Sequence, residues 1–314
     1  MQTILGSGGQ IANELARELH RSFTTDIRLA SRNPQRINPG DELASANLLD
    51  LDQTLAAASG SEVIYFTAGL PADTELWERQ FPTMLDNALT AARSAGAKFV
   101  YFDNTYMYPQ DSRVQDEQTA FAPAGRKGTV RALMAQMVLE EMQRGEIPVL
   151  IGRAPEFYGP GRTQSFTNAL ILDRIAQGKK PFIPVADRYL RSLIWTPDAS
   201  RALATLANTS TAYGQTWHLP TDPDRLTYRQ FASLANEVFD SNSRPMILPR
   251  WVLAAGGRIS ARIAELDELL PRYAADNIFD STKFTTHFPD FSITKYREGL
   301  EIIKAEREIT SQHA

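Results

Sequence analysis

Short apolar runs alternate with longer amphipathic stretches over the first two-thirds of the chain. The apolar runs predict strands at residues 3–5, 27–30, 45–48, 62–67, 98–103 and 147–152. Apolar residues at helical spacing predict helices between several of these strands, at residues 10–20, 53–57, 75–94 and 129–143. Short strands that alternate with helices form βαβ units and a parallel sheet that is covered on both faces. Because crossovers between parallel strands are right-handed, we expect a doubly wound α/β fold.

The pattern becomes less regular after about residue 155. Glycine and proline interrupt it at residues 159–161, 178–181 and 220–223, and helices are predicted at residues 228–239 and 294–307. We expect one domain at residues 1–155, to which chain segments near residues 185–210 return. Residues 156–314 are expected to form mainly a smaller C-terminal lobe.

Composition narrows the class of protein. Of the 314 residues 43% are hydrophobic and 22% are charged, which is typical of a folded protein with a buried core. The net charge is -4 and no basic block occurs, so we expect no nucleic-acid partner. Cysteine is absent and the four histidines lie far apart, which argues against a metal site and excludes thiolate catalysis. The sequence shows neither a signal-peptide pattern nor an apolar run of membrane-spanning length, so we expect a cytoplasmic protein with no membrane partner.

A glycine-rich loop follows the first predicted strand and opens the first predicted helix. It reads Gly6-Ser7-Gly8-Gly9-Gln10-Ile11-Ala12. In the pattern GxxGxxA, Gly6 makes the turn, Gly9 permits close approach of a ligand, and Ala12 packs the helix on the sheet. The start of the helix would bind a pyrophosphate through its N–H groups and its positive dipole end. We therefore expect a Rossmann-like domain in which Gly6, Gly9, Gln10 and Ile11 bind a dinucleotide, a flexible turn being the alternative.

The ends of the next two strands bear on the choice of dinucleotide. Ser31 and Arg32 follow the second predicted strand, where NAD-binding domains carry an acidic residue for the ribose 2′-hydroxyl. A hydroxyl and a guanidinium suit a 2′-phosphate instead, so NADP(H) is favoured over NAD(H). The alternative for Arg32 is an ordinary solvated position. Asp50 and Leu51 are candidates to flank the adenine, although Asp50 is equally suited to cap a helix.

Several further segments carry a family resemblance. They are Phe66–Gly69, Arg153–Gly161, Arg191–Ala199, Asp280–Lys283 and Ile293–Leu300. Together with the glycine loop, they resemble motifs of the extended short-chain dehydrogenase/reductase superfamily, which includes nucleotide-sugar epimerases and dehydratases. Arg153–Gly161, for example, is similar to that superfamily's R-P-x-N-V-Y-G-P-G run. The resemblance covers nearly the whole chain, and it implies cofactor contacts by Thr67, Ala68, Gly69, Ala154 and Glu156.

The catalytic motif of that superfamily is altered in this chain. Its members use a Tyr-x-x-x-Lys pair, in which the Tyr handles a proton and the Lys lowers the pKa of the Tyr and holds the nicotinamide ribose. None of the ten tyrosines here is followed by a Lys four residues later. Lys127 stands in the place of the Tyr, Arg131 in that of the Lys, Asn104 in that of a Ser or Thr, and Phe81 near that of an Asn. The chain therefore resembles the atypical, epimerase-like members.

Three side chains are candidates to handle the proton. Lys127 could do so if burial and its neighbours Arg126 and Arg131 lowered its pKa toward neutrality, and it could also bind the cofactor. Tyr106 and Tyr108, just past the fifth strand, are alternative donors. Arg131 could hold the ribose hydroxyls. The competing interpretation is that Lys127 and Arg131 share one helical face and only hold phosphate or face solvent.

The resemblance also suggests a substrate region. Arg191 matches an arginine that contacts the diphosphate in sugar-nucleotide enzymes, and a structural salt bridge is the alternative. Tyr158, Gln164 and Tyr189 are expected to line the mouth of a cleft between the lobes. The helices predicted at residues 75–94 and 129–143 imply a possible homodimer, unless they only face their own sheet.

Two functions remain open from the sequence. One is an NADP(H)-dependent oxidoreductase or epimerase-like enzyme with a small-molecule substrate, either a small carbonyl compound or a nucleotide-sugar type. The other is a non-catalytic NADP-sensing regulatory or binding protein, which the loss of the Tyr-x-x-x-Lys pair would explain. The substrate lobe favours the enzyme.

Overall fold

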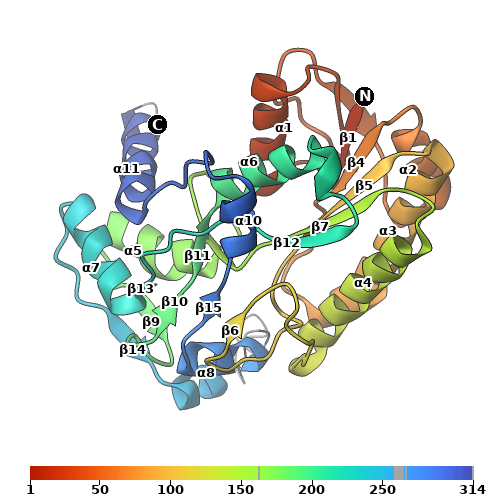
Figure 1. The fold of residues 1–314 in the computed structure, drawn as a ribbon. Helices are drawn as coiled ribbons and strands as arrows, with labels where there is room; N and C mark the ends of the chain where they lie inside the picture. Colours follow the sequence, from red (N-terminus) through yellow and green to blue (C-terminus); the bar gives the residue numbers. More distant parts are fainter. Residues whose placement is uncertain (162, 258–264, 266, 313–314) are drawn as a thin grey trace. The chain divides into compact units, whose positions relative to one another are not determined.

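The computed structural model describes residues 1–161, 163–257, 265 and 267–312, and within it the chain divides into two compact units (Figure 1). The first unit comprises Met1–Met107, Phe121–Ala154 and Ala199–Leu219. The second comprises Tyr108–Ala120, Pro155–Asp198 and Pro220–Ala314. This division differs from the expected one, because residues 108–120 belong to the second unit and the returning segment is 199–219.

A parallel sheet forms the centre of the first unit. Its seven strands lie in the order β12 (Gln215–His218), β7 (Val149–Arg153), β5 (Lys98–Asp103), β4 (Val63–Phe66), β1 (Gln2–Leu5), β2 (Ile27–Ser31) and β3 (Glu42–Ser45). All neighbouring pairs are parallel. The strand order reverses direction beside β1, where open α/β sheets bind their ligands. The expected Rossmann-like, doubly wound fold is confirmed.

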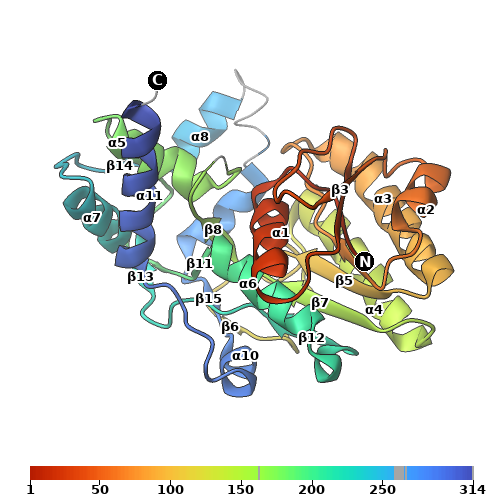
Figure 2. The same cartoon turned by 90° about the horizontal axis from the view of Figure 1, so that it is seen from above.

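Helices cover both faces of this sheet (Figures 1 and 2). On one face lie α2 (Leu51–Ala58), α3 (Thr74–Ala95) and α4 (Gly125–Arg144). On the other lie α1 (Gln10–Ser22) and α6 (Thr196–Ala207), where Ser200 Oγ donates to the Ile11 carbonyl at 3.0 Å. Every residue of β1, β4 and β7 is buried, as expected of strands covered on both faces.

The third strand and helix α4 begin several residues away from their expected positions, each for a local reason. The third strand ends at Ser45, because its pairing with β2 ends at Ser31 and the residues that follow lead into the cap of α2. Helix α4 begins at Gly125, four residues earlier than expected, so it includes Lys127. On α4, Leu133 is 50% exposed. The homodimer through α3 and α4 stays a prediction.

In its described residues, the second unit contains four two-stranded sheets and an aromatic core. The strand pairs are β8 (Glu156–Tyr158) with β11 (Leu193–Trp195), β9 (Phe182–Pro184) with β14 (Met246–Leu248), β10 (Leu190–Arg191) with β13 (Leu226–Thr227), and β6 (Val114–Gln115) with β15 (Ile278–Phe279). Its helices are α5 (Asp173–Ala176), α7 (Tyr228–Val238), α8 (Arg250–Gly257), α10 (Thr282–His287) and α11 (Tyr296–Gln312). Tyr158, Trp195, Phe231 and Tyr296 pack together in the core.

Among the helices of the described segments, none is both long and apolar enough to cross a bilayer. The same part of the chain contains no group of His, Asp and Glu side chains arranged to hold a metal ion.

Candidate functional site

The glycine loop after β1 is a tight turn with open space beside it. Gly6 and Gly8 have φ values of 92° and 100°, which a residue with a side chain rarely adopts. A Cβ at Gly6 would lie 2.4 Å from Ala68 Cα, so this position must be glycine for the loop to fit against the end of β4. At Gly8 and Gly9 a Cβ would meet no atom of the described residues within 4 Å. The loop thus has room for a group close to its backbone.

Helix α1 begins without a neutralising side chain. Its N-cap is Gly9, no side-chain cap is formed among the described residues, and its first turn holds no acidic residue. By contrast, Asp50 caps α2 and Asp73 caps α3, each accepting a backbone N–H. The positive end of the α1 dipole is therefore left for an anion. Together with the space at Gly8 and Gly9, this fits the pyrophosphate of a dinucleotide.

The neighbouring strand ends place the other expected cofactor residues. Ser31 is half-buried at the end of β2, and Arg32 beyond it is exposed and has no ion pair within the described ranges. Thr67 Oγ1 donates to the Leu5 carbonyl at 3.3 Å, which joins the ends of β1 and β4. Asp50 Oδ1 accepts from the Gln53 amide at 3.0 Å.

Four of the expected cofactor residues take structural positions or lie exposed. Asp50 caps α2, and it is followed by Leu51 at 41% exposure. Gly69 is exposed after β4. Ala154 is fully buried, and its amide donates to the Asp103 carbonyl at 3.0 Å.

Lys127 lies in the interior of the first unit, which rules out the solvent-facing interpretation. Its side chain is 1% exposed, and Nζ donates to Thr74 Oγ1 at 2.6 Å. The Nζ atom also lies 6.0 Å from the centre of the Trp77 ring, within range of a cation–π interaction. Lys127 on α4 is thus held by two side chains from the first turn of α3.

The two arginines expected to act on Lys127 have other partners. Arg126 is exposed and forms an ion pair with Glu78. Arg131 is buried, and its Nη2 donates to Asp103 Oδ1 at 2.8 Å. Asp103 Oδ2 accepts from Arg153 Nε at 3.1 Å, so one carboxylate at the end of β5 holds two buried guanidinium groups. Burial lowers the pKa of Arg131, but its electrostatic interactions with Tyr101 and Asp103 outweigh burial and raise that pKa, so Arg131 stays charged.

Tyr106 joins the group formed by Lys127, Thr74, Trp77, Arg131 and Asp103, which we call the Lys127 cluster. Tyr106 is half-buried and stacks on Trp77, with ring centres 6.1 Å apart and an interplanar angle of 13°. Tyr108 belongs to the second unit, is fully buried, and donates its hydroxyl to the Asp116 carbonyl at 3.0 Å. Asn104 Oδ1 accepts from the Tyr106 amide at 3.0 Å and so shapes the turn that carries Tyr106.

Arg191 forms the salt bridge that was its alternative interpretation. The side chain is 2% exposed, its Nη2 donates to Glu156 Oε2 at 3.0 Å, and its Nη1 donates to the Arg272 carbonyl at 2.6 Å. Glu156 also accepts hydroxyl hydrogen bonds from Tyr228 at 2.5 Å and Tyr273 at 3.1 Å. Burial by itself would raise the pKa of Glu156, but Arg191 and the Tyr228 hydrogen bond hold it below its ordinary value. Glu156 is therefore an ionised partner of Arg191 inside the second unit.

The three residues expected at the mouth of a cleft have different surroundings. Tyr158 is 1% exposed and packs in the aromatic core, which corrects the expectation that it lines an opening. Gln164 is exposed, and Tyr189 is half-buried with its hydroxyl accepting from Arg188 at 2.9 Å.

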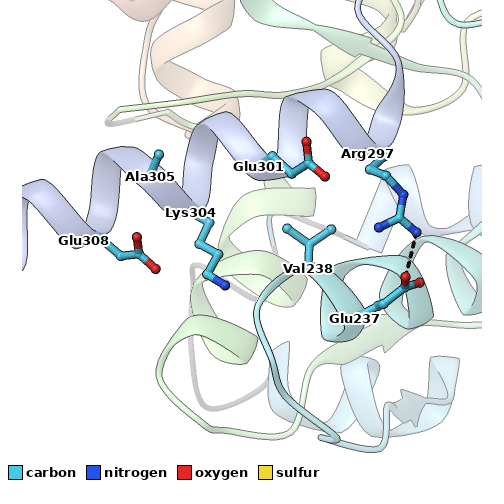
Figure 3. Close-up of a pocket in the computed structure, with 7 residues that line it drawn as sticks. All are labelled: Glu237, Val238, Arg297, Glu301, Lys304, Ala305 and Glu308. Atoms are coloured by element: carbon cyan, nitrogen blue, oxygen red, sulfur yellow. Dashed lines mark hydrogen bonds and ion pairs between the residues drawn. The ribbon is translucent and has the colours of Figure 1, made fainter.

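A shallow groove of about 400 Å³ lies elsewhere in the second unit, between α7 and α11 (Figure 3). Charged side chains make up most of its lining, which consists of Glu237, Val238, Arg297, Glu301, Lys304, Ala305 and Glu308. Arg297 spans it to Glu237 at 2.9 Å. None of the residues that the sequence singled out lines this groove, and its ion pairs indicate a solvated surface.

Several residues of the Lys127 cluster were not found from the sequence. Thr74 and Trp77 lie in a helix some 50 residues before Lys127, and no motif links them to it. Asp103 gives a weak signal in the sequence, because it is an acidic residue that directly follows an apolar strand run. In the structure its side chain is 0% exposed. A buried carboxylate needs a cationic partner, which Arg131 and Arg153 supply.

The chain was also compared with known proteins. The model of the NAD dependent epimerase/dehydratase family matches residues 3–218. A comparison with curated protein sequences gave no match.

Solved structures resemble the chain over its whole length. UDP-glucuronic acid 4-epimerase from Bacillus cereus, in complex with NAD, is 15% identical, with a TM-score of 0.77 over 99% of each chain. UDP-glucose 4-epimerase from Thermotoga maritima, with UDP-glucose, is 15% identical, with a TM-score of 0.79 over 99% of this chain and 100% of that one. The protein gox2253 is 19% identical, with a TM-score of 0.81 over 100% and 98%. At these identities the likeness establishes a shared fold.

Proposed function

The chain belongs to the NAD dependent epimerase/dehydratase family, and from this premise we propose that it is an NADP(H)-dependent, epimerase-like oxidoreductase acting on a small carbonyl compound. The observation that carries the proposal is the start of α1. It has no acidic residue in its first turn and adjoins a loop with open space at Gly8 and Gly9. These features suit the pyrophosphate of a dinucleotide.

The glycine loop and the end of β2 would bind different parts of the cofactor. Backbone N–H groups of Gly9, Gln10 and Ile11 would bind the pyrophosphate. Ser31 and the exposed Arg32 would bind a 2′-phosphate, which is the reason to propose NADP(H) over NAD(H). When bound, the nicotinamide would give a hydride to the substrate carbon or take one from it.

Lys127 is the side chain that we propose to hold the proton. A carbonyl oxygen that gains negative charge needs a proton donor or a positive charge beside it, and an ammonium supplies both. The buried ion pair of Arg131 with Asp103 fixes α4 next to the end of β5, where Lys127 lies. Tyr106 is the alternative donor. Tyr108 is not proposed, because its hydroxyl is already hydrogen-bonded to Asp116.

The burial of Arg191 and its ion pair with Glu156 favour a small carbonyl substrate over a nucleotide sugar. A diphosphate needs cationic partners, and arginine binds phosphate best when its fork of donors is open. Here Glu156 occupies Arg191, and the whole side chain is buried. A ligand anion would have to displace a carboxylate that also holds two tyrosine hydroxyls.

The test is a turnover assay with purified protein, NADPH or NADH, and panels of small aldehydes, ketones and UDP-sugars. We expect cofactor oxidation with at least one small carbonyl compound and loss of that activity in Lys127→Met. No turnover with either panel, despite dinucleotide binding, would contradict the proposal and favour the NADP-sensing regulatory protein. Turnover of a UDP-sugar alone would refute the proposed substrate class.

A further inference from the structure

We propose that Thr74 and Trp77, on the first turn of α3, are positioning residues that hold Lys127 and Tyr106 at the reacting centre. The proposal rests on the proposed function, since it concerns the two side chains offered there as proton donors. Neither Thr74 nor Trp77 belongs to a motif that the sequence singled out. Their role follows from contacts inside the first unit.

The first contact is a buried hydrogen bond of defined polarity. An ammonium can only donate, so at 2.6 Å Lys127 Nζ donates and Thr74 Oγ1 accepts. Thr74 is 7% exposed and Lys127 is 1% exposed, so water does not readily replace either partner. Fixing one of the three N–H groups of Lys127 also fixes the directions of the other two. Thr74 thereby sets where Lys127 presents its proton.

Thr74 itself is held in place by the start of its helix. Asp73 caps α3 by accepting the Leu76 amide at 2.8 Å, which orders the first turn. Threonine is branched at Cβ, so its side chain has few rotamers in a helix. The hydroxyl direction is therefore set by the backbone of α3, and a long, flexible lysine is matched with a short, stiff acceptor.

The second contact is made by Trp77, three residues further along the first turn of α3. Its indole N–H donates to the Pro71 carbonyl at 2.6 Å, and Phe81 packs against its ring edge-on at 5.1 Å, so the ring is fixed. The ring lies 6.0 Å from Lys127 Nζ and stacks on Tyr106. One rigid side chain therefore contacts both of the proposed proton donors.

The separation of those donors is also constrained by α4. A Cβ at Gly128 would lie 3.0 Å from the Tyr106 carbonyl oxygen, so the start of α4 packs closely on the turn after β5. Lys127 precedes Gly128 directly. Displacement of Lys127 relative to Tyr106 is thus opposed from two sides, by α4 and by the first turn of α3.

The experiment compares Thr74→Val, which removes the hydroxyl at nearly constant shape, with Thr74→Ser, which keeps it. Thr90→Val is the matched control, because Thr90 lies on the same helix and its hydroxyl accepts from Arg93 at 2.9 Å, away from Lys127. Two readouts are used on the full chain. One is the rate at which an acylating reagent labels Lys127 in the cofactor-free protein, measured by mass spectrometry, and the other is kcat and KM across pH.

We expect Thr74→Val to change Lys127 labelling at least threefold, to lower kcat about tenfold with KM for the dinucleotide within about twofold, and to move the pH profile of kcat. Thr74→Ser should restore all of these to near the wild-type values, and Thr90→Val should leave them unchanged. Equal labelling in wild type and Thr74→Val, or equal effects of Thr74→Val and Thr90→Val, would overturn the proposal. Absence of dinucleotide binding in the wild type would instead refute the proposed function, and the labelling readout would still decide whether Thr74 holds Lys127.

Discussion

Gly6 and Gly9 have different roles in the glycine loop, one in its folding and one in ligand binding, and alanine substitutions can distinguish these roles. At Gly6 the backbone has a φ of 92° and a Cβ would lie 2.4 Å and 2.5 Å from two backbone atoms of Ala68. No rotamer relieves that clash, so Gly6→Ala should lower the free energy of unfolding by about 2–5 kcal/mol. At Gly9 the φ is −85° and the space is open, so Gly9→Ala should cost no more than about 1 kcal/mol, the difference between glycine and alanine at an N-cap.

Dinucleotide affinity, unlike stability, should be lowered by the substitution at Gly9. A methyl group at Gly9 would fill space next to the start of α1, so we expect Gly9→Ala to weaken NADPH binding at least about tenfold, or 1.4 kcal/mol. Gly40→Ala is the control, because Gly40 also has open space around a Cβ in the first unit but lies outside the loop. The assays are denaturant unfolding of the cofactor-free variants and calorimetric titration with NADPH. Unchanged affinity in Gly9→Ala, or a stable Gly6→Ala, would refute this account of the loop.

Three further predictions concern buried charges and cofactor choice. Asp103→Asn removes the carboxylate charge that pairs with the buried guanidinium groups of Arg131 and Arg153, so denaturant unfolding should show a loss of about 3–5 kcal/mol. A loss below about 1 kcal/mol would contradict the ion-pair interpretation. Arg191 and Tyr228 lower the pKa of Glu156 from 4.5 against the effect of burial, so the ion pair stabilises the fold above that pH and is lost as the pH falls through the lower folded-state pKa. The difference in free energy of unfolding between wild type and Glu156→Gln should therefore narrow on acidification. A difference that stays constant with pH would argue against this pairing. Arg32→Ala should weaken NADPH binding about tenfold relative to NADH in calorimetric titrations, and an unchanged ratio would remove the basis for preferring NADP(H).

Much of the first unit could be predicted because its signals are local. The apolar run at residues 98–103 coincides with β5, and the glycine loop lies between β1 and α1 as the spacing of its glycines indicated. Strand and helix patterns are set by near neighbours, and right-handed crossovers limit how they combine. The third strand was misplaced because its position depends on pairing with β2, which the run at residues 45–48 does not show.

The site could be predicted only in part, because its key contacts join distant positions. Lys127 and Arg131 were identified from their places in a motif, but the partners Thr74 and Asp103 lie 53 and 28 residues away from them. The burial of individual aromatic side chains also could not be predicted from the sequence. Tyr158 is expected from the sequence at the mouth of a cleft, whereas tertiary packing places it in the aromatic core.

We expect a nicotinamide dinucleotide to bind at the start of α1, where no side chain of the described residues forms a cap. Calorimetric titration of the wild-type protein with NADPH, NADP⁺, NADH and NAD⁺ tests it most directly. We predict saturable one-to-one binding of at least one of these dinucleotides, tightest for a 2′-phosphorylated one. No binding of any of the four to the folded protein would contradict the account.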